Sequence, residues 1–93
     1  MIFPFKLYKI SGHSMEPTLP VDSYVLTVVW AKKYRAGDIV VFKKEDSVFI
    51  KRIVSIKDES SFLLRGDNIA DSLDSNSFGP IQKHDLVGKV VWY

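Results

Sequence analysis

The sequence predicts a small all-β domain built on a curled or barrel-like, mostly antiparallel sheet. Its apolar residues fall in short runs rich in β-branched and aromatic side chains, a composition typical of strands. Glycine, proline and clusters of Asp, Asn or Ser separate these runs at short intervals, as turns do. Curling such a sheet leaves few strand edges open to other chains. The 93 residues have room for one domain, spanning residues 1–93.

Six segments carry the strand pattern, and three of them lie in the N-terminal half. Residues 5–10 mix apolar and basic side chains, and the turn formers Gly12 and Pro17 follow. Residues 24–30 are rich in Val, Leu and aromatic side chains. Residues 38–42 follow the turn signal Ala36-Gly37 and are apolar apart from the first position.

The other three strand segments are residues 48–56, 62–65 and 86–93. Polar turns at residues 44–46 and 58–60 bound the first of them, and a long polar stretch over residues 66–80 lies before the last. Only residues 14–19 and 69–73 could hold a helical turn, and Pro17 keeps the first of these short.

Composition and charge exclude several classes of protein. The net charge of +2, from 13 basic and 11 acidic residues, does not support binding to a nucleic acid backbone. The absence of cysteine excludes disulfides, a thiolate nucleophile and a zinc finger. No apolar run approaches the roughly 20 residues of a spanning helix, and no export signal is present. We therefore expect a cytoplasmic protein, with at most a peripheral membrane contact through Phe3, Phe5 and Leu7 beside two lysines.

No metal or cofactor is expected. Asp67, Asp71 and Asp74 lack the alternating spacing and final glutamate of a calcium loop. These carboxylates fit a solvated turn region that caps its own backbone groups.

A candidate nucleophile stands in the first turn region, SGHSMEP at residues 11–17. Gly12 permits close backbone approach and Pro17 fixes the exit of the turn, so the Ser14 hydroxyl can be presented at an accessible bend. The backbone N–H of Ser14 would then face an oxyanion. Taken alone, such a segment is more often an ordinary loop that contains a serine.

A candidate base lies on the strand expected at residues 48–56. The period of two places Lys51 between Phe49 and Ile53 on one face, and Arg52 between two hydrophobic residues on the other. Burial lowers the pKa of a lysine from its reference value of about 10.4, whereas an arginine stays protonated. Lys51 can therefore become a base for a serine proton. The plainer alternative is a lysine that extends along the strand to solvent.

Five ordered segments resemble the motif boxes of type I signal peptidases and their soluble relatives. They are SMEPTL at 14–19, GDIVVF at 37–42, IKRIV at 50–54, GDN at 66–68 with DSLDS at 71–75, and LVGK at 86–89. The resemblance spans nearly the whole chain and implies a β-rich serine endopeptidase, with Ser14 as nucleophile and Lys51 as general base. It also implies that the Ser72 hydroxyl bonds to the lysine and orients it.

The resemblance further implies an extended precursor protein or peptide as substrate, with a small residue before the scissile bond in a shallow apolar pocket. The matching pocket positions are Ile10, Met15, Leu19, Phe49 and Ile50. The oxyanion would face the N–H of Ser14 and the position of Gly12, where some members supply a serine hydroxyl that glycine lacks.

Structural support is expected from Arg52 paired with Asp67. Asp74 matches an aspartate that pairs in the family with an arginine two residues later, but that position is Asn76 here. The family's arginine after Gly-Asp-Asn is likewise replaced by Ile69. These departures affect the surroundings of the Ser/Lys pair.

The chain is similar in length and layout to the soluble proteases that trim precursors of nickel-type superoxide dismutase. The expected function is removal of an N-terminal signal or pro-segment, with such a precursor as one candidate substrate. One alternative is a signal peptidase core that acts on secreted preproteins. Another is a non-catalytic peptide-binding or regulatory module of the same fold. A Ser/His/Asp triad is disfavoured, since adjacent side chains such as His13 and Ser14 point apart on an extended segment.

Overall fold

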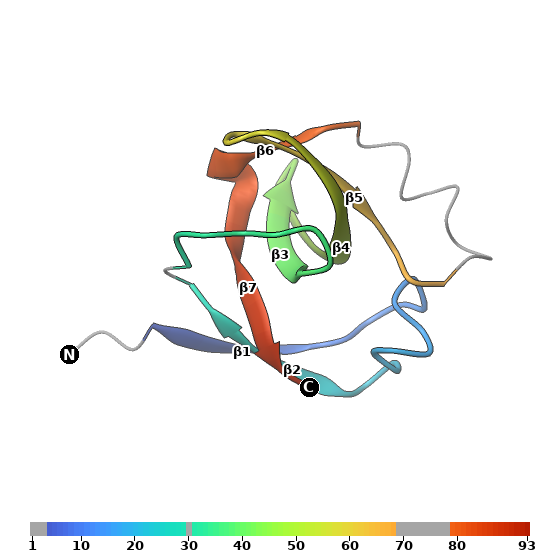
Figure 1. Cartoon of the computed structure of the whole chain (residues 1–93). Helices are drawn as coiled ribbons and strands as arrows, with labels where there is room; N and C mark the ends of the chain where they lie inside the picture. Colours follow the sequence, from blue (N-terminus) through green and yellow to red (C-terminus); the bar gives the residue numbers. More distant parts are fainter. Residues whose placement is uncertain (1–3, 30, 69–78) are drawn as a thin grey trace.

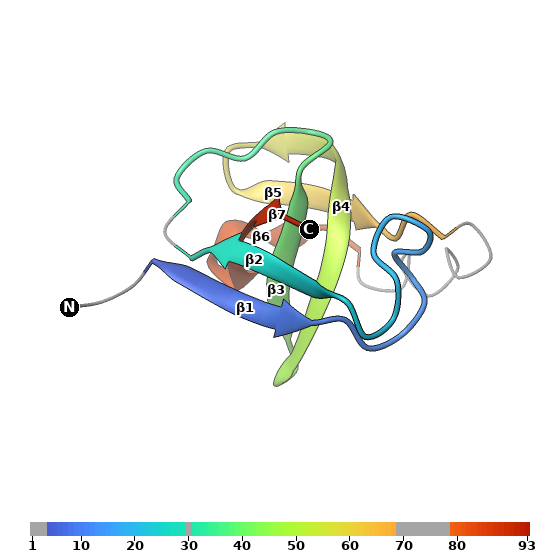
Figure 2. The same ribbon diagram turned by 90° about the horizontal axis from the view of Figure 1, so that it is seen from below.

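The computed structural model describes residues 4–29, 31–68 and 79–93 (Figure 1). It contains one seven-stranded antiparallel sheet in the order β1-β2-β7-β3-β4-β5-β6. The strands are β1 (Phe5–Lys9), β2 (Tyr24–Val28), β3 (Ile39–Lys44), β4 (Ser47–Asp58), β5 (Ser61–Arg65), β6 (Ile81–Gln82) and β7 (Leu86–Trp92), with the 3-10 turn η3 (Lys83–Asp85) before β7. The sheet curls strongly (Figures 1 and 2), but its end strands β1 and β6 do not pair in the described part of the chain. The all-β prediction is confirmed, in the form of an open curled sheet.

Each of the six expected segments contains a strand, although the boundaries differ. β4 runs from Ser47 to Asp58 and is longer than expected. β6 was not expected, because two residues are too few to show a period of two. Within residues 14–19 the chain makes turns, and the N–H of Leu19 donates to the carbonyl of Met15 at 2.9 Å. The turn expected at residues 69–73 lies outside the described residues.

β3 has no solvent-exposed face over its first four residues, which are all buried. Because side chains alternate along a strand, Ile39 and Val41 join one hydrophobic cluster and Val40 and Phe42 join another. The first cluster contains Ile10, Met15, Leu19, Val25, Ile39, Val41 and Val90. The second contains Val40, Phe42, Ile53, Phe62, Leu64 and Ile81. The two hydrophobic clusters therefore lie on opposite faces of β3 and its neighbour β4.

The connection between β1 and β2, residues 10–23, projects from the ends of these strands as a loop (Figure 2). Two backbone hydrogen bonds of 2.8 Å close its base, from the N–H of Ile10 to Ser23 and from the N–H of Asp22 to Ile10. The buried side chains of Met15 and Leu19 attach the loop to the first hydrophobic cluster. We call this connection the serine loop.

Within the described residues, no helix is long and apolar enough to cross a membrane.

Candidate active site

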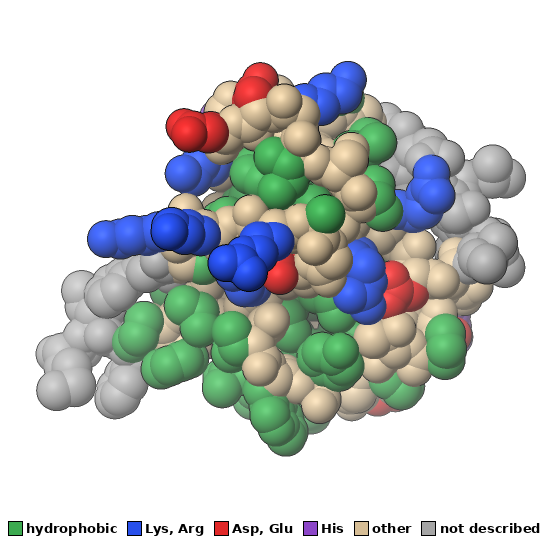
Figure 3. Space-filling model, viewed as in Figure 1, with side chains coloured by type: hydrophobic (Ala, Val, Ile, Leu, Met, Phe, Trp, Pro, Cys, Tyr) green, Lys and Arg blue, Asp and Glu red, His purple; other side chains and the backbone are tan. Residues whose placement is uncertain are grey.

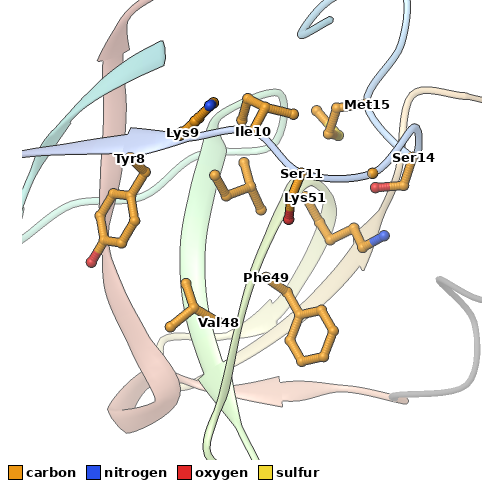
Figure 4. Close-up of a pocket in the computed structure, with 11 residues that line it drawn as sticks. Tyr8, Lys9, Ile10, Ser11, Ser14, Met15, Val48, Phe49 and Lys51 are labelled. Atoms are coloured by element: carbon orange, nitrogen blue, oxygen red, sulfur yellow. The ribbon is translucent and has the colours of Figure 1, made fainter. Parts of the chain in front are cut away.

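A cavity of about 370 Å³ lies between the serine loop and β4 (Figure 4). Its lining residues are Tyr8, Lys9, Ile10, Ser11, Gly12, Ser14, Met15, Val48, Phe49, Ile50 and Lys51. β1 and β4 both contribute to this lining, although β2, β7 and β3 separate them in the sheet. The curl of the sheet therefore brings the two sides of the cavity together.

Ser14 stands in the serine loop, with Ser11, Gly12 and His13 exposed before it and Met15 buried after it. Met15 fastens the loop to the core, so the chain can present Ser14 at the cavity wall as a half-buried residue. Gly12 has a φ of +106°, a backbone conformation that side chains with a Cβ rarely adopt. A serine at this position would strain the loop conformation seen here, so the glycine suits the shape of this loop.

Lys51 lies on β4 and is buried, with a relative exposure of 6%. Its neighbours on the same face of the strand are Phe49 and Ile53, and Val40 is its register partner on β3. Burial among such residues disfavours the charged ammonium relative to the neutral amine. The strand thus presents a lysine in surroundings suited to a proton acceptor.

Figure 4 shows the hydroxyl of Ser14 and the amine of Lys51 pointing toward one another on the same side of the cavity. No hydrogen bond joins these two side chains in the described part of the chain. Catalytic hydrogen bonds are often long before substrate binds and shorten in the substrate complex. The structure therefore places a serine hydroxyl and a lysine amine from distant parts of the sequence at a common space.

A network of charged side chains supports the site from the other face of β4. Arg52 donates to both carboxylate oxygens of Asp67, through Nε at 2.8 Å and an η nitrogen at 2.7 Å. It also donates to the carbonyl of Gly37 at 2.7 Å. Asp67 accepts a further hydrogen bond of 2.6 Å from the hydroxyl of Thr18 in the serine loop. The network therefore links β4, the segment after β5 and the serine loop.

The same hydrogen bonds determine the electrostatics of the pair. The guanidinium of Arg52, followed by the Thr18 hydroxyl, lowers the pKa of Asp67 against the opposing effect of burial. The hydrogen bond to Asp67 in turn raises the pKa of Arg52. Both groups are therefore ionised at neutral pH.

Asn68 follows Asp67 and contacts the serine loop directly. Its backbone N–H donates to the carbonyl of Ser14 at 2.8 Å, and its Nδ2 donates to the carbonyl of His13 at 2.9 Å. The local sequence pattern does not indicate this role for Asn68. The only signal was its place in the GDN segment beside Asp67.

Four of the five expected pocket residues line the cavity, namely Ile10, Met15, Phe49 and Ile50. Leu19 does not, because its side chain is 1% exposed and packs in the first hydrophobic cluster. Tyr8 and Val48 line the cavity and were missed. Tyr8 lies two positions before Ile10, and a strand places such residues on the same face, so the period of two was a usable signal.

Two expected site residues, Ser72 and Asp74, lie outside the described residues, as do Ile69 and Asn76. Their roles remain predictions.

Neither histidine is arranged as a base for Ser14. The Nδ1 atom of His13 lies 2.8 Å from a carboxylate oxygen of Glu16. His84 is exposed on η3, and its Nε2 lies 3.5 Å from Asp85. Across residues 4–29, 31–68 and 79–93, no cluster of three or more His, Cys, Asp or Glu could hold a metal ion.

A second cavity, of about 580 Å³, is larger and has a different lining. It is lined by Lys32, Lys33, Tyr34, Arg35, Ile56, Asp58, Glu59, Phe62 and Lys83. The hydroxyl among these lining residues is the phenol of Tyr34, and no serine, threonine or cysteine is among them.

Comparison with known proteins gives one family. The model of the family described as signal peptidase, peptidase S26, matches residues 1–60 and 55–93. The mitochondrial inner membrane protease subunit 2 of Saccharomyces cerevisiae is 26% identical over 117 residues, which cover 90% of this chain and 66% of that protein. The protein of the same name from Schizosaccharomyces pombe is 25% identical over 108 residues, covering 88% and 60%. The chain thus spans less than two thirds of the length of these relatives.

Proposed function

The chain belongs to the signal peptidase family, peptidase S26, and from this premise we propose that it is a serine endopeptidase acting through Ser14 and Lys51. The observation that supports this most is that the two side chains face one cavity, although 37 positions separate them in the sequence (51 − 14). An unactivated serine is a weak nucleophile, and a buried amine is one of the few groups that can take its proton near neutral pH.

In the acylation step, the Ser14 Oγ attacks the carbonyl carbon of the scissile peptide bond. Its proton passes to the neutral amine of Lys51, and the carbonyl oxygen becomes an oxyanion. The N–H of Ser14 is the donor available to this oxyanion. The oxyanion would also face the position of Gly12, which has no side-chain hydroxyl to donate. When the tetrahedral intermediate collapses, the bond to the leaving amine breaks and the Lys51 ammonium gives that amine its proton.

In the deacylation step, water attacks the ester carbonyl and Lys51 again accepts the proton. Collapse of the second intermediate breaks the ester bond and returns a proton to Ser14 Oγ. The products are a new carboxyl end and a new amino end, and the enzyme is regenerated. We further propose that Ser72 orients the Lys51 amine in both steps, as the third member of a relay does.

The substrate proposed is the N-terminal segment of a precursor, bound in extended form. The cavity is small, and the buried side chains of Ile10 and Met15 form part of its wall. Such a wall suits a small apolar residue before the scissile bond, while backbone pairing supplies affinity. A nickel-type superoxide dismutase precursor and a secreted preprotein are the two candidate substrates.

A peripheral contact with a membrane is also proposed. Figure 3 shows hydrophobic side chains gathered over the lower part of the molecule, where β1, β2 and the end of β7 lie in Figure 1. Phe5 and Leu7 on β1 and Trp92 at the end of β7 are 51%, 57% and 62% exposed. The relatives named above are inner membrane proteases, which favours an apolar face of this kind being used at a lipid surface.

The experiment incubates the purified protein with each candidate precursor and sequences any new N-terminus. We expect a single cut after a small residue, which Ser14→Ala abolishes. Ser60→Ala is the matched control, because Ser60 bonds Asp58 at the β4–β5 turn and does not line the cavity. Cleavage that persists in Ser14→Ala would refute the nucleophile. Peptide binding without cleavage by the unmodified protein would favour the non-catalytic module.

A further inference from the structure

Asn68 holds both peptide planes that flank Ser14. Its Nδ2 bonds the carbonyl of the His13–Ser14 peptide at 2.9 Å, and its backbone N–H bonds the carbonyl of the Ser14–Met15 peptide at 2.8 Å. Each peptide unit is planar, so fixing its oxygen also restricts the direction of its N–H. With both planes held, the two backbone dihedral angles of Ser14 have little freedom left.

The first of these planes contains the N–H of Ser14, which is the donor proposed for the oxyanion. In a trans peptide the C=O and N–H bonds point in opposite directions, and the His13–Ser14 peptide is trans. Asn68 therefore pulls the carbonyl of His13 to one side and turns the N–H of Ser14 to the other. No acceptor is bonded to this N–H within the described residues, so it is available to a ligand.

Asn68 is itself anchored to the strand that carries the base. Its neighbour Asp67 receives two hydrogen bonds from Arg52, the residue that follows Lys51 on β4. Asp67 also accepts from Thr18, so the segment touches the serine loop at a second place. These contacts connect the segment that holds Ser14 to β4 and, through Thr18, to a second point of the serine loop.

We propose that Asn68 is a positioning residue, which aims the Ser14 N–H at the oxyanion and fixes the serine relative to Lys51. The inference rests on the proposed peptidase function. It assigns to Asn68 an effect on the transition state, where the oxyanion forms, and little effect on binding of the ground-state peptide.

The test compares Asn68→Ala and Asn68→Asp with the unmodified chain. Neither variant has the Nδ2 donor, and aspartate keeps the size of asparagine. We expect kcat to fall by about 10- to 100-fold, since loss of a whole oxyanion donor costs about 100- to 1,000-fold. KM for an alanine-containing peptide substrate should change less than about twofold. The affinity for the matching peptide aldehyde, which forms a tetrahedral adduct on serine, should fall with kcat.

Thr18→Val is the matched control. It removes a hydrogen bond between the same segment and the serine loop but leaves both peptide planes of Ser14 held. It should lower the melting temperature without the fall in kcat at a nearly constant KM that is expected for the Asn68 variants. An unchanged kcat in both Asn68 variants would overturn the inference while leaving the peptidase function intact. The same follows if Thr18→Val lowers kcat as much as they do, with KM nearly constant.

A readout independent of activity separates the two proposals. The ¹⁵N order parameter of the Ser14 amide should be near the rigid value of about 0.85 in the unmodified chain and lower in Asn68→Ala. If no peptide is cleaved at all, the peptidase proposal fails and the oxyanion role fails with it, whereas the order parameters still show whether Asn68 holds the peptide planes of Ser14. If neither variant folds, a rigid Ser14 amide in the unmodified chain supports the positioning role, and a mobile one overturns it.

Discussion

Lys51 is the one charged side chain that is buried within the described residues. Phe49 and Ile53 flank it on its face of β4, so the cost of desolvating an ammonium there is large. Desolvation favours the neutral amine, which is the form that the proposed mechanism requires to accept the proton of Ser14.

The first prediction concerns substitution of this lysine. Lys51→Arg should be as inactive as Lys51→Met, because a guanidinium stays protonated and cannot act as a base. The measurement is the rate of peptide cleavage, with circular dichroism to verify the fold of each variant. Substantial activity in Lys51→Arg would contradict the mechanism.

The pH profile gives a second, independent prediction. Cleavage should increase with pH as the Lys51 ammonium loses its proton, without a limb near 6.5 that a histidine would give. The chain has two histidines, so the double variant His13→Gln/His84→Gln removes them all. Its profile should keep the same shape. A limb near 6.5 that disappears in this variant would assign the base to a histidine.

Asp67 leads to a prediction about acid stability. Its pKa is lowered in the folded chain, chiefly by Arg52, so its contribution to folding is present above the unfolded value of about 3.9. The contribution is lost as pH falls through the lower, folded value. Urea unfolding from pH 6 to pH 2 should therefore show a steeper loss for the natural chain than for Asp67→Asn. Parallel curves would mean that the ion pair does not stabilise the fold.

Individual residues could be predicted where their chemistry is unusual for their surroundings. Lys51 stood out because a cation lies between hydrophobic residues with strand spacing, and Ser14 because a glycine and a proline bracket it. Asn68 could not be found in this way, because its bonds to His13 and Ser14 join positions 55 and 54 apart (68 − 13 and 68 − 14). Leu19 was assigned to the pocket from the family resemblance, but the turn after Met15 directs it into the core.

At the level of elements, β3 and β4 determine the position of the site. The uninterrupted apolar run of β3 was readable from the sequence, because a strand covered on both faces does not alternate. The ends of β4 were less readable, since Ser47, Lys57 and Asp58 are polar and exposed. β6 pairs only Ile81 and Gln82 with β5, so long-range pairing and not local pattern creates it.

Gly88 allows a test of how closely β7 packs against β2. A Cβ at this position would collide with the backbone oxygen of Val28 and lie 2.7 Å from the Cγ2 of Thr27. Because one obstacle is backbone, Gly88→Ala should destabilise the fold by about 1–3 kcal/mol, the usual cost of overpacking. Val91→Ala, an exposed position on the same strand, is the control. Equal urea midpoints for the two variants would refute the close approach.

At the level of the whole molecule, the site exists because the sheet curls. β1 leads into the serine loop and β4 carries Lys51, yet three strands lie between them in the sheet order. In a flat sheet these elements would be far apart, at about 4.8 Å per strand. Composition predicted a curled all-β domain, whereas the meeting of Ser14 with Lys51 was implied only by the resemblance of five ordered segments to a known family. Local pattern does not encode which distant strands a curl brings together.

The most direct measurement on the proposed dyad is the formation of an acyl-enzyme. The protein is mixed with an activated ester of an alanine-ended peptide, quenched in acid and mapped by mass spectrometry. We predict that the acyl group is found on Ser14, and that its formation is about 100-fold slower or more in Lys51→Met, since a positioned base typically contributes that much. An acyl group on another residue, or equal rates in the two proteins, would contradict the assignment of Ser14 and Lys51 as nucleophile and base.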